Sequence, residues 1–473
     1  MDIEKERGIS VTSSVLQFNY DGYCINILDT PGHQDFSEDT YRTLMAADSA
    51  VMVIDASKGV EAQTIKLFKV CVMRHIPIFT FINKMDRDAR DTFELLDDIE
   101  TVLGIKTCPV NWPIGSGKEF KGVYDRKTKI VSTFQAISTG GAKKAEETDY
   151  HIDDEALKEL VGPYLFDQFN EEIELIDGAT EEMDIEKVRA GELSPVFFGS
   201  ALNTFGIEQF LNYFLKMTTP PIGRNSSEGI IDPVTEPFSA FVFKIQANMN
   251  KAHRDRIAFM RICSGKFEAG MEVYHAASKR KIKLSQPQQL MAQDRKIVDE
   301  AYAGDVIGVF DPDLFSIGDT LTTGGKKFEY EGIPTFAPEH FCRVVQLNSM
   351  KRKQFVKGVT QIAQEGAIQI FQEYTAGLSE IIVGVVGVLQ FDVLKYRLEN
   401  EYGCEIRLEP IPYNYIRWVK DPTIDVTKLK RVSDVKKVKD MKGNPLLLFA
   451  NEWVIDQVLQ HNEGLELEEF RKN

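Results

Sequence analysis

Three short polar motifs, each placed directly after an apolar run, constrain the fold of this sequence more than any other feature. They are DTPGH at 29–33, NKMD at 83–86 and GSAL at 199–202, and they follow the apolar runs 23–28, 77–82 and 194–198. Apolar runs that alternate with amphipathic helical stretches are typical of a parallel β-sheet. Ligands bind at the carboxyl ends of the strands in such sheets. The three motifs are therefore predicted to contribute to one ligand site.

The first 222 residues are predicted to form this α/β domain. A further buried strand is expected at 49–55, and helices at 61–74 and 91–103, where apolar residues recur with helical spacing. Residues 112–193 separate two strands of the sheet and are predicted to be an inserted subdomain. Within it, 143–192 carries 17 Asp and Glu against 5 Lys and Arg, so this segment holds −12 of the net charge of −16. We interpret this run as a solvated helical face.

Two further domains are expected after residue 222. Proline and glycine punctuate 218–237, which indicates a linker. Between 238 and 332 the segments are short, β-rich and separated by glycine turns, so 223–335 is predicted to hold a small β-barrel. The last segment, 336–473, has the order strand, helix, strand, strand, helix, which predicts an α+β domain of the ferredoxin-like type.

Composition disfavours several classes of protein. No apolar run approaches the roughly 20 residues that span a bilayer, and the N-terminus is charged from Asp2 onward, unlike a secretory signal. The six cysteines are scattered without a Cys-x-x-Cys pair, which favours reduced thiols in a cytoplasmic protein over a zinc site. We expect a monomer without a membrane partner.

The DTPGH motif has the chemistry of a sensor for a metal ion and a γ-phosphate. A carboxylate at a strand end, here Asp29, can hold Mg²⁺ directly or through water. Gly32 lacks a Cβ, so its backbone N–H can approach a γ-phosphate. The imidazole of His33 can then hydrogen-bond an attacking water. Upstream, the hydroxyl of Ser10 is a second candidate Mg²⁺ ligand. Taken alone, each of these residues is more often part of an ordinary turn or surface.

The other two motifs have the chemistry of a guanine pocket. Asp86 can accept hydrogen bonds from guanine N1–H and from the 2-amino group, and adenine offers neither donor. The stem of Lys84 can lie along the base, and the side chain of Asn83 can tie neighbouring loops. In GSAL, small residues let a backbone N–H reach guanine O6. A polar loop is the alternative interpretation of each motif alone, but their order favours a nucleotide site.

Together, these motifs resemble those of translational GTPases. RGIS at 7–10, DTPGH, NKMD and GSAL occur in that order and are followed by a predicted β-barrel. The closer resemblance is to the peptide chain release factor 3 family, and it extends over essentially the whole chain. It is carried by 4–14, DFSEDTYRTL at 35–44, FVFKIQANM at 241–249 and VVGVLQFDV at 385–393.

The resemblance implies a function in translation termination. Members of the family bind the ribosome, use GTP, GDP and Mg²⁺, and speed the departure of class I release factors once the nascent peptide is freed. By motif, Ser10 belongs to switch I, and switch II contains Asp29, Thr30, Pro31, Gly32 and His33. The implied catalytic residues are Gly32 and His33, and the implied metal ligands are Ser10 and Asp29. Guanine is read by Asn83, Lys84 and Asp86, with Ser200, Ala201 and Leu202 completing the pocket.

The phosphate-binding loop of such GTPases, G-x-x-x-x-G-K-[ST], does not occur ahead of DTPGH in this sequence. That loop supplies the backbone amides and the lysine that hold the β- and γ-phosphates. GSGK at 115–118 is no substitute, because Trp112 stands where the first glycine belongs. We therefore expect an N-terminally truncated GTPase domain that by itself binds guanine nucleotides weakly and hydrolyses GTP negligibly. A non-hydrolysing ribosome-binding scaffold and an elongation factor G relative are the alternatives.

Basic residues in the later domains are candidates for contacts with ribosomal RNA phosphates. Solvated surface charge is the alternative for each of them. In the barrel they are Lys251, His253, Arg254, Arg256 and Arg261. In the last domain they are Lys351, Arg352, Lys353, Lys428, Lys430, Arg431, Lys436, Lys437 and Lys439.

Overall fold

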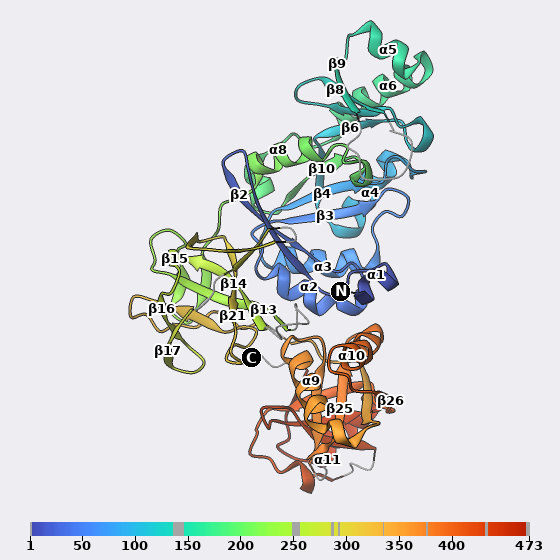
Figure 1. Cartoon of the computed structure of the whole chain (residues 1–473). Coiled ribbons are helices and arrows are strands. Elements are labelled where there is room, and N and C mark those ends of the chain that lie inside the picture. Colours follow the sequence, from blue (N-terminus) through green and yellow to red (C-terminus); the bar gives the residue numbers. More distant parts are fainter. Residues whose placement is uncertain are drawn as a thin grey trace. The chain divides into compact units, whose positions relative to one another are not determined.

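The computed structural model describes residues 2–135, 146–247, 256–284, 288–291, 294–333, 335–374, 377–430 and 434–469. The chain divides into two compact units, one of Ala47–Pro220 and the other of Met1–Ala46 together with Pro221–Asn473. Figure 1 shows the elements of both units and labels many of them. In the described part of the chain, no helix is long and apolar enough to cross a bilayer.

A four-stranded parallel sheet forms the centre of the unit Ala47–Pro220. Its order is β3-β4-β10-β5, and its strands are β3 (Ala50–Asp55), β4 (Ile78–Asn83), β10 (Leu193–Phe198) and β5 (Lys106–Pro109). The helices are α3 (Ala62–Met73), α4 (Thr92–Leu103) and α8 (Ile207–Met217). Apolar side chains of α8 pack against those of β4 and β10 in one core. The predicted helices and central strands are confirmed, whereas β5 was not predicted.

Helix α4 shows how the sequence sets the limits of an element. The side chain of Asp91 accepts hydrogen bonds from the backbone N–H groups of Phe93 and Glu94, at 2.9 and 3.1 Å, and so caps the first turn. At the other end, Gly104 adopts φ 73°, a left-handed conformation that glycine takes without strain. Apolar residues between these caps recur with helical spacing, which is why sequence periodicity located this helix.

The prediction of a buried strand at 49–55 is confirmed as a strand, β3, but is wrong on burial for part of it. Val51 is 43% exposed and Val53 is 59% exposed. Among the described strands, β3 pairs only with β4, so it is an edge strand of the sheet. An apolar run predicts a strand buried on both faces, but it does not reveal whether that strand lies at the centre or at the edge.

An α+β subdomain lies between β5 and β10 in the sequence. Its sheet is antiparallel, in the order β6-β7-β8-β9, with strands β6 (Asn111–Ile114), β7 (Gly122–Asp125), β8 (Ile130–Gln135) and β9 (Glu146–His151). A short helix η2 (Gly117–Glu119) connects β6 to β7, and the helices that follow β9 are α5 (Glu155–Val161), α6 (Pro163–Ala179) and α7 (Ile185–Arg189). Trp112 of β6 is fully buried, and its Nε1–H donates to Glu172 of α6 at 2.8 Å. Most described acidic residues of 143–192 are exposed, in agreement with a solvated run, but fewer than half of those exposed lie on the helices.

The second unit begins with α1 (Asp2–Arg7), a hairpin of β1 (Ser14–Tyr20) and β2 (Tyr23–Asp29), the short helix η1 (Gln34–Phe36) and α2 (Ser37–Leu44). The prediction that 23–28 is a buried strand of the parallel sheet is wrong. β2 pairs antiparallel with β1 alone among the described strands, and Tyr23 and Ile27 are 52% and 42% exposed. One edge of β2 is therefore open, and Tyr23 and Ile27, which lie on the same face of the strand, are exposed to solvent.

A barrel-like sheet follows, in the order β17-β16-β22-β13-β14-β21-β18-β19. These strands are β13 (Ser239–Ala247), β14 (Arg256–Ser264), β16 (Glu272–His275), β17 (Arg280–Lys283), β18 (Gln288–Met291), β19 (Asp294–Ile297), β21 (Val306–Phe310) and β22 (Thr320–Thr322). A second pair joins β15 (Lys266–Glu268) to β20 (Glu300–Tyr302). One face of β13 and β14 forms the barrel core, and their other face packs against Val15 of β1 and Ala46. The first 46 residues thus share a core with the barrel.

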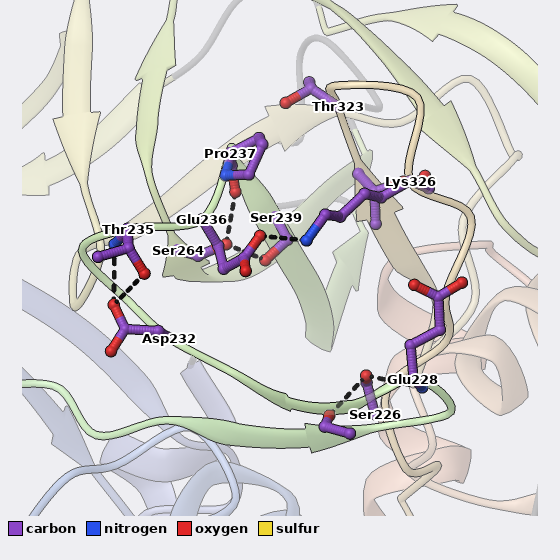
Figure 2. Close-up of polar contacts among 12 residues, drawn as sticks. Ser226, Glu228, Asp232, Thr235, Glu236, Pro237, Ser239, Ser264, Thr323 and Lys326 are labelled. Carbon is purple, nitrogen blue, oxygen red and sulfur yellow. Dashed lines mark hydrogen bonds and ion pairs between the residues drawn. The ribbon is translucent and has the colours of Figure 1, made fainter.

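Polar contacts fasten the segment before the barrel to the barrel itself (Figure 2). This segment contains the hairpin of β11 (Arg224–Ser226) and β12 (Gly229–Ile231). The carboxylate of Asp232 accepts hydrogen bonds from both the N–H and the hydroxyl of Thr235. Glu236 forms an ion pair with Lys326, and the hydroxyl of Ser264 donates to the carbonyl oxygen of Pro237 at 2.6 Å.

The last domain is built on an antiparallel sheet in the order β26-β23-β25-β24-β28-β29-β27-β30. Its elements are β23 (His340–Gln346), η4 (Ser349–Lys351), α9 (Arg352–Gln364), β24 (Gln369–Glu373), β25 (Gly377–Val385), α10 (Leu389–Asn400), β26 (Ile406–Pro410), β27 (Tyr415–Val419), η5 (Val426–Lys428), β28 (Val435–Lys439), β29 (Pro445–Phe449), α11 (Glu452–His461) and β30 (Leu467–Glu468). The first four strands and two helices follow the ferredoxin-like βαββαβ order, as predicted.

Candidate functional site

Asn83 joins the two loops that follow the central strands of the parallel sheet. It is the last residue of β4, and its Oδ1 accepts hydrogen bonds from the backbone N–H of Lys84 at 2.8 Å and of Ala201 at 2.9 Å. The backbone N–H of Met85 donates to the carbonyl oxygen of Gly199 at 3.1 Å. Since β4 and β10 are parallel neighbours, the motifs NKMD and GSAL meet at their carboxyl ends, as predicted.

Lys84 is held by a residue that sequence reasoning did not select. Its Nζ lies 2.7 Å from Oδ2 of Asp55, the last residue of β3. Burial alone would raise the pKa of Asp55, but hydrogen bonds from Lys84 and Ser57 outweigh it and lower this pKa to about 2. The position of Asp55 at a strand end, next to the strand that carries NKMD, was the available signal. The ion pair fixes the direction of the Lys84 stem.

Asp86 remains available for a ligand. Its side chain is half-buried. Among the described residues, no hydrogen bond or ion pair reaches its carboxylate. The loop around it is fixed by backbone contacts, since the N–H of Gly117 donates to the carbonyl oxygen of Met85 at 2.9 Å. A preformed loop with a free carboxylate is the arrangement that recognition of guanine N1–H and the 2-amino group requires.

The GSAL loop is built on two close approaches. A Cβ at Gly199 would lie 2.6 Å from the carbonyl oxygen of Phe205 and 2.8 Å from Cζ of Phe81, so a larger residue would displace the loop. Ser200 is fully buried, and its hydroxyl accepts a hydrogen bond from Nδ2 of Asn203 at 2.9 Å. Ala201 and Leu202 are exposed. The Ser200 side chain therefore shapes the loop, and Ala201 and Leu202 are exposed to solvent.

The residues predicted to meet the metal and the γ-phosphate belong to the other unit. Asp29 ends β2, and both its side chain and that of Ser10 are exposed. Carboxylate and hydroxyl oxygens are suitable for Mg²⁺, which keeps several waters and takes few protein ligands. No cluster of three or more His, Cys, Asp or Glu that could hold a metal ion occurs in the described part of the chain.

The backbone between Asp29 and His33 is tied to α2 at Pro31 and has open space around Gly32. Gly32 is exposed, and no heavy atom lies within 4 Å of the position that a Cβ would take. Before it, the carbonyl oxygen of Pro31 accepts a hydrogen bond from the hydroxyl of Thr40 at 3.1 Å, which ties the loop to α2. Thr30 is half-buried. Gly32 is therefore an exposed residue in a loop that is tied to α2 at the preceding residue.

His33 precedes η1 and caps it. Its Nδ1 accepts a hydrogen bond from the backbone N–H of Asp35 at 3.2 Å, and its ring meets Phe36 edge to face at 6.2 Å between centroids. The side chain is 38% exposed. The imidazole is thus oriented on one side and open on the other. Asp35, which sequence reasoning did not select as a site residue, supplies this orientation.

The basic residues proposed for ribosomal RNA are only partly described. Lys251, His253, Arg254 and Arg431 lie outside the described residues. The interpretation of Arg256 as a surface cation is wrong, because it is 5% exposed and its Nε lies 2.8 Å from Asp311. A basic residue in a short β-rich segment cannot be assigned to the core or the surface from its neighbours in sequence when its partner is more than fifty positions away. Lys428, by contrast, is exposed.

Three family models match successive parts of the chain. Residues 1–220 match the elongation factor Tu GTP binding domain, and 237–324 match elongation factor G domain 2. Residues 330–459 match the C-terminal domain of the class II release factor RF3. The three matches follow the same order as the α/β, barrel and α+β parts of the structure.

Curated relatives match over nearly the whole chain. "Peptide chain release factor 3" of Symbiobacterium thermophilum is 55% identical over 98% of this chain and 88% of its own length. The protein of the same name from Synechococcus elongatus is 52% identical over 99% of this chain and 84% of its own length. A crystal structure of a Thermus thermophilus protein matches with a TM-score of 0.68 at 20% identity, over 94% of this chain and 65% of that one. The structural match shows the fold alone.

Proposed function

The chain belongs to the peptide chain release factor 3 family of translation-termination GTPases, and we propose that it speeds the departure of class I release factors from the ribosome after the peptide is freed. The observation that carries this proposal is the match of the last domain to a release factor model, at 330–459. The barrel matches an elongation factor G domain, so the barrel alone does not separate termination from elongation. The last domain does.

Guanine recognition is assigned to the two loops that Asn83 joins. Asp86 accepts from N1–H and the 2-amino group, and a purine without these donors leaves its carboxylate unpaired, at a cost of about 1–3 kcal/mol or more. Lys84 lies along the base, and the loop of Ser200, Ala201 and Leu202 closes the pocket and presents a backbone N–H to O6. The hydrogen bonds from Asn83 support this role because they hold both loops in place without a ligand.

The hydrolytic step is assigned to the residues from Ser10 to His33. Ser10 and Asp29 would hold Mg²⁺, which supplies charge stabilisation at the phosphates when bound. Thr30 and Pro31 shape the loop, and the N–H of Gly32 meets the γ-phosphate. His33 hydrogen-bonds the attacking water. The exposed carboxylate of Asp29 and the open surroundings of Gly32 support this assignment.

The proposal also includes the domain limits, the cellular location, the oligomeric state and the partners of the protein. We assign 1–222 to the GTP-binding domain with its insertion at 112–193, 223–335 to the β-barrel, and 336–473 to the α+β domain. The protein acts as a cytoplasmic monomer, with the ribosome and class I release factors as partners. The lack of a G-x-x-x-x-G-K-[ST] segment favours a non-hydrolysing scaffold, but the family matches do not support that alternative better than a GTPase.

Release factor departure tests the proposal. Ribosomes that have released their peptide would carry a fluorescent class I release factor, and the 473-residue chain would be added with millimolar GTP to offset weak nucleotide binding. We expect faster loss of the labelled factor with GTP and no acceleration with ATP. Unchanged departure, while co-sedimentation shows the chain bound to the ribosome, would overturn the proposal and support a scaffold.

A further inference from the structure

The hydrogen bond from the Asp35 backbone to His33 favours one of the two tautomers of the imidazole. The backbone N–H of Asp35 donates to Nδ1 of His33 at 3.2 Å, so Nδ1 is the acceptor and the neutral ring carries its proton on Nε2. The Oδ1 atom of Asp35 lies 3.4 Å from the same Nδ1. The orientation and the tautomer of the His33 ring thus depend on the position of the Asp35 backbone.

The last domain holds Asp35 from the other side. The Oδ2 atom of Asp35 accepts a hydrogen bond from the backbone N–H of Leu389 at 2.8 Å. Leu389 is the first residue of α10, where an unpaired N–H and the helix dipole both favour a carboxylate. The Asp35 side chain is 8% exposed, so water competes little for this bond. The two residues are 354 positions apart in the sequence.

The contact is close enough to require glycine at 387. A Cβ built there would lie 2.2 Å from Cγ and 2.5 Å from Cα of Asp35, and the latter atom belongs to the backbone. The loop that carries Gly387 is itself fixed, since Oε1 of Gln390 accepts hydrogen bonds from the N–H of Val386 at 2.9 Å and of Gly387 at 3.0 Å. Asp35 therefore rests on a fixed surface of the last domain.

We propose that Asp35 is a positioning residue through which the start of α10 fixes the ring orientation and the tautomer of His33. This inference rests on the proposed role of His33 beside the attacking water. With its proton on Nε2, the ring donates a hydrogen bond to the water oxygen and does not remove a proton from the water through that atom. When the last domain separates from Asp35, the backbone N–H is released and both tautomers become populated.

Nitrogen NMR of the imidazole tests this inference on the full chain, without nucleotide or ribosome. The protein holds seven histidines, and the pair of ring nitrogens of His33 is identified by its loss in His33→Gln. In the unaltered chain we expect one protonated nitrogen, Nε2, and one unprotonated nitrogen, Nδ1. Gly387→Ala, which pushes against Asp35, and Asp35→Ala, which removes its anchor, are both expected to abolish this single-tautomer pattern.

Matched variants separate positioning from a general loss of structure. Asp35→Asn keeps an oxygen that accepts from the Leu389 N–H, and it is expected to restore the pattern that Asp35→Ala loses. Asp392→Asn removes an exposed ion pair between Arg7 and α10, at 3.0 Å, without touching Asp35, and is expected to change nothing at His33. Gly178→Ala adds a Cβ with no heavy atom within 4 Å and serves as the control for a glycine replacement.

Two outcomes would overturn the inference. One is an unchanged His33 pattern in both Gly387→Ala and Asp35→Ala. The other is a pattern that Asp35→Asn loses as completely as Asp35→Ala does, with the exchange protection of α10 amides retained. Because the measurement needs no release factor, its result is independent of the departure assay. If His33 shows the expected tautomer but the chain does not speed release factor departure, the proposed function is contradicted. If the chain speeds departure but His33 lacks this tautomer, only the positioning role is contradicted.

Discussion

Asn in place of Asp86 is expected to remove the preference for guanine. The carboxylate accepts two hydrogen bonds from the base, each worth about 1.5–3 kcal/mol when one partner is charged. An amide offers one oxygen acceptor and turns an N–H₂ toward the 2-amino group. The affinity for GDP should therefore fall about 10²–10⁴-fold.

Xanthine carries an oxygen where guanine has its 2-amino group, so XDP should bind the variant better than GDP does. Competition between GDP, XDP and ADP, followed by saturation-transfer NMR, measures this order.

Asp88→Asn is the matched control for that experiment. Asp88 is an exposed carboxylate two residues further along the same loop, so its replacement changes the charge by the same amount. We expect it to leave the order of the three nucleotides unchanged. If Asp86→Asn also kept GDP ahead of XDP, Asp86 would not contact the base, and guanine reading would have to be assigned elsewhere in the pocket.

Ala in place of Arg397 is expected to destabilise the last domain strongly. Arg397 of α10 is 3% exposed, and its guanidinium contacts Glu365 at 2.9 Å and Glu401 at 3.0 Å. Burial already raises the pKa of Glu365, with Arg397 acting against this rise. Without the arginine, two carboxyl groups remain close together and buried. Removing one partner of such a network costs about 3–5 kcal/mol, which amide hydrogen exchange of α9 and α10 would report.

Arg407→Ala provides the contrast. Arg407 also pairs with a glutamate, Glu409, at 2.6 Å, but its side chain is 62% exposed. Exposed pairs contribute about 0–1 kcal/mol, so exchange in α9 and α10 should remain unchanged within error. Equal effects of the two replacements would show that burial does not determine the strength of the Arg397 network.

Sequence predicted the elements whose signal lies within the element itself. Helix α4 has its cap at Asp91, its apolar spacing and its stop at Gly104 in one continuous segment. The meeting of NKMD and GSAL was also predictable, because the carboxyl ends of neighbouring parallel strands lie at the same edge of a sheet. The ferredoxin-like order of the last domain follows from the succession of its strands and helices.

Features that depend on residues far apart in the sequence could not be predicted from local patterns. The exposure of Val51 and Val53 shows that one face of β3 is uncovered, and the strand's own residues do not encode what packs on that face. Arg256 carries the same charge as a surface residue, yet Asp311 makes it part of the interior. Asp35 and Leu389 meet across 354 positions. Each of these facts arises from tertiary packing, which no local pattern reports.

The most direct test of the account is a titration of the 473-residue chain with GDP and with ADP. The base-reading loops are held in place by Asn83, whereas the sequence holds no G-x-x-x-x-G-K-[ST] segment for the phosphates. We predict that GDP binds with a Kd weaker than micromolar and that ADP binds more weakly still. Equal binding of GDP and ADP would contradict guanine recognition by this pocket, and a micromolar or tighter Kd for GDP would contradict the expected weak hold on the phosphates.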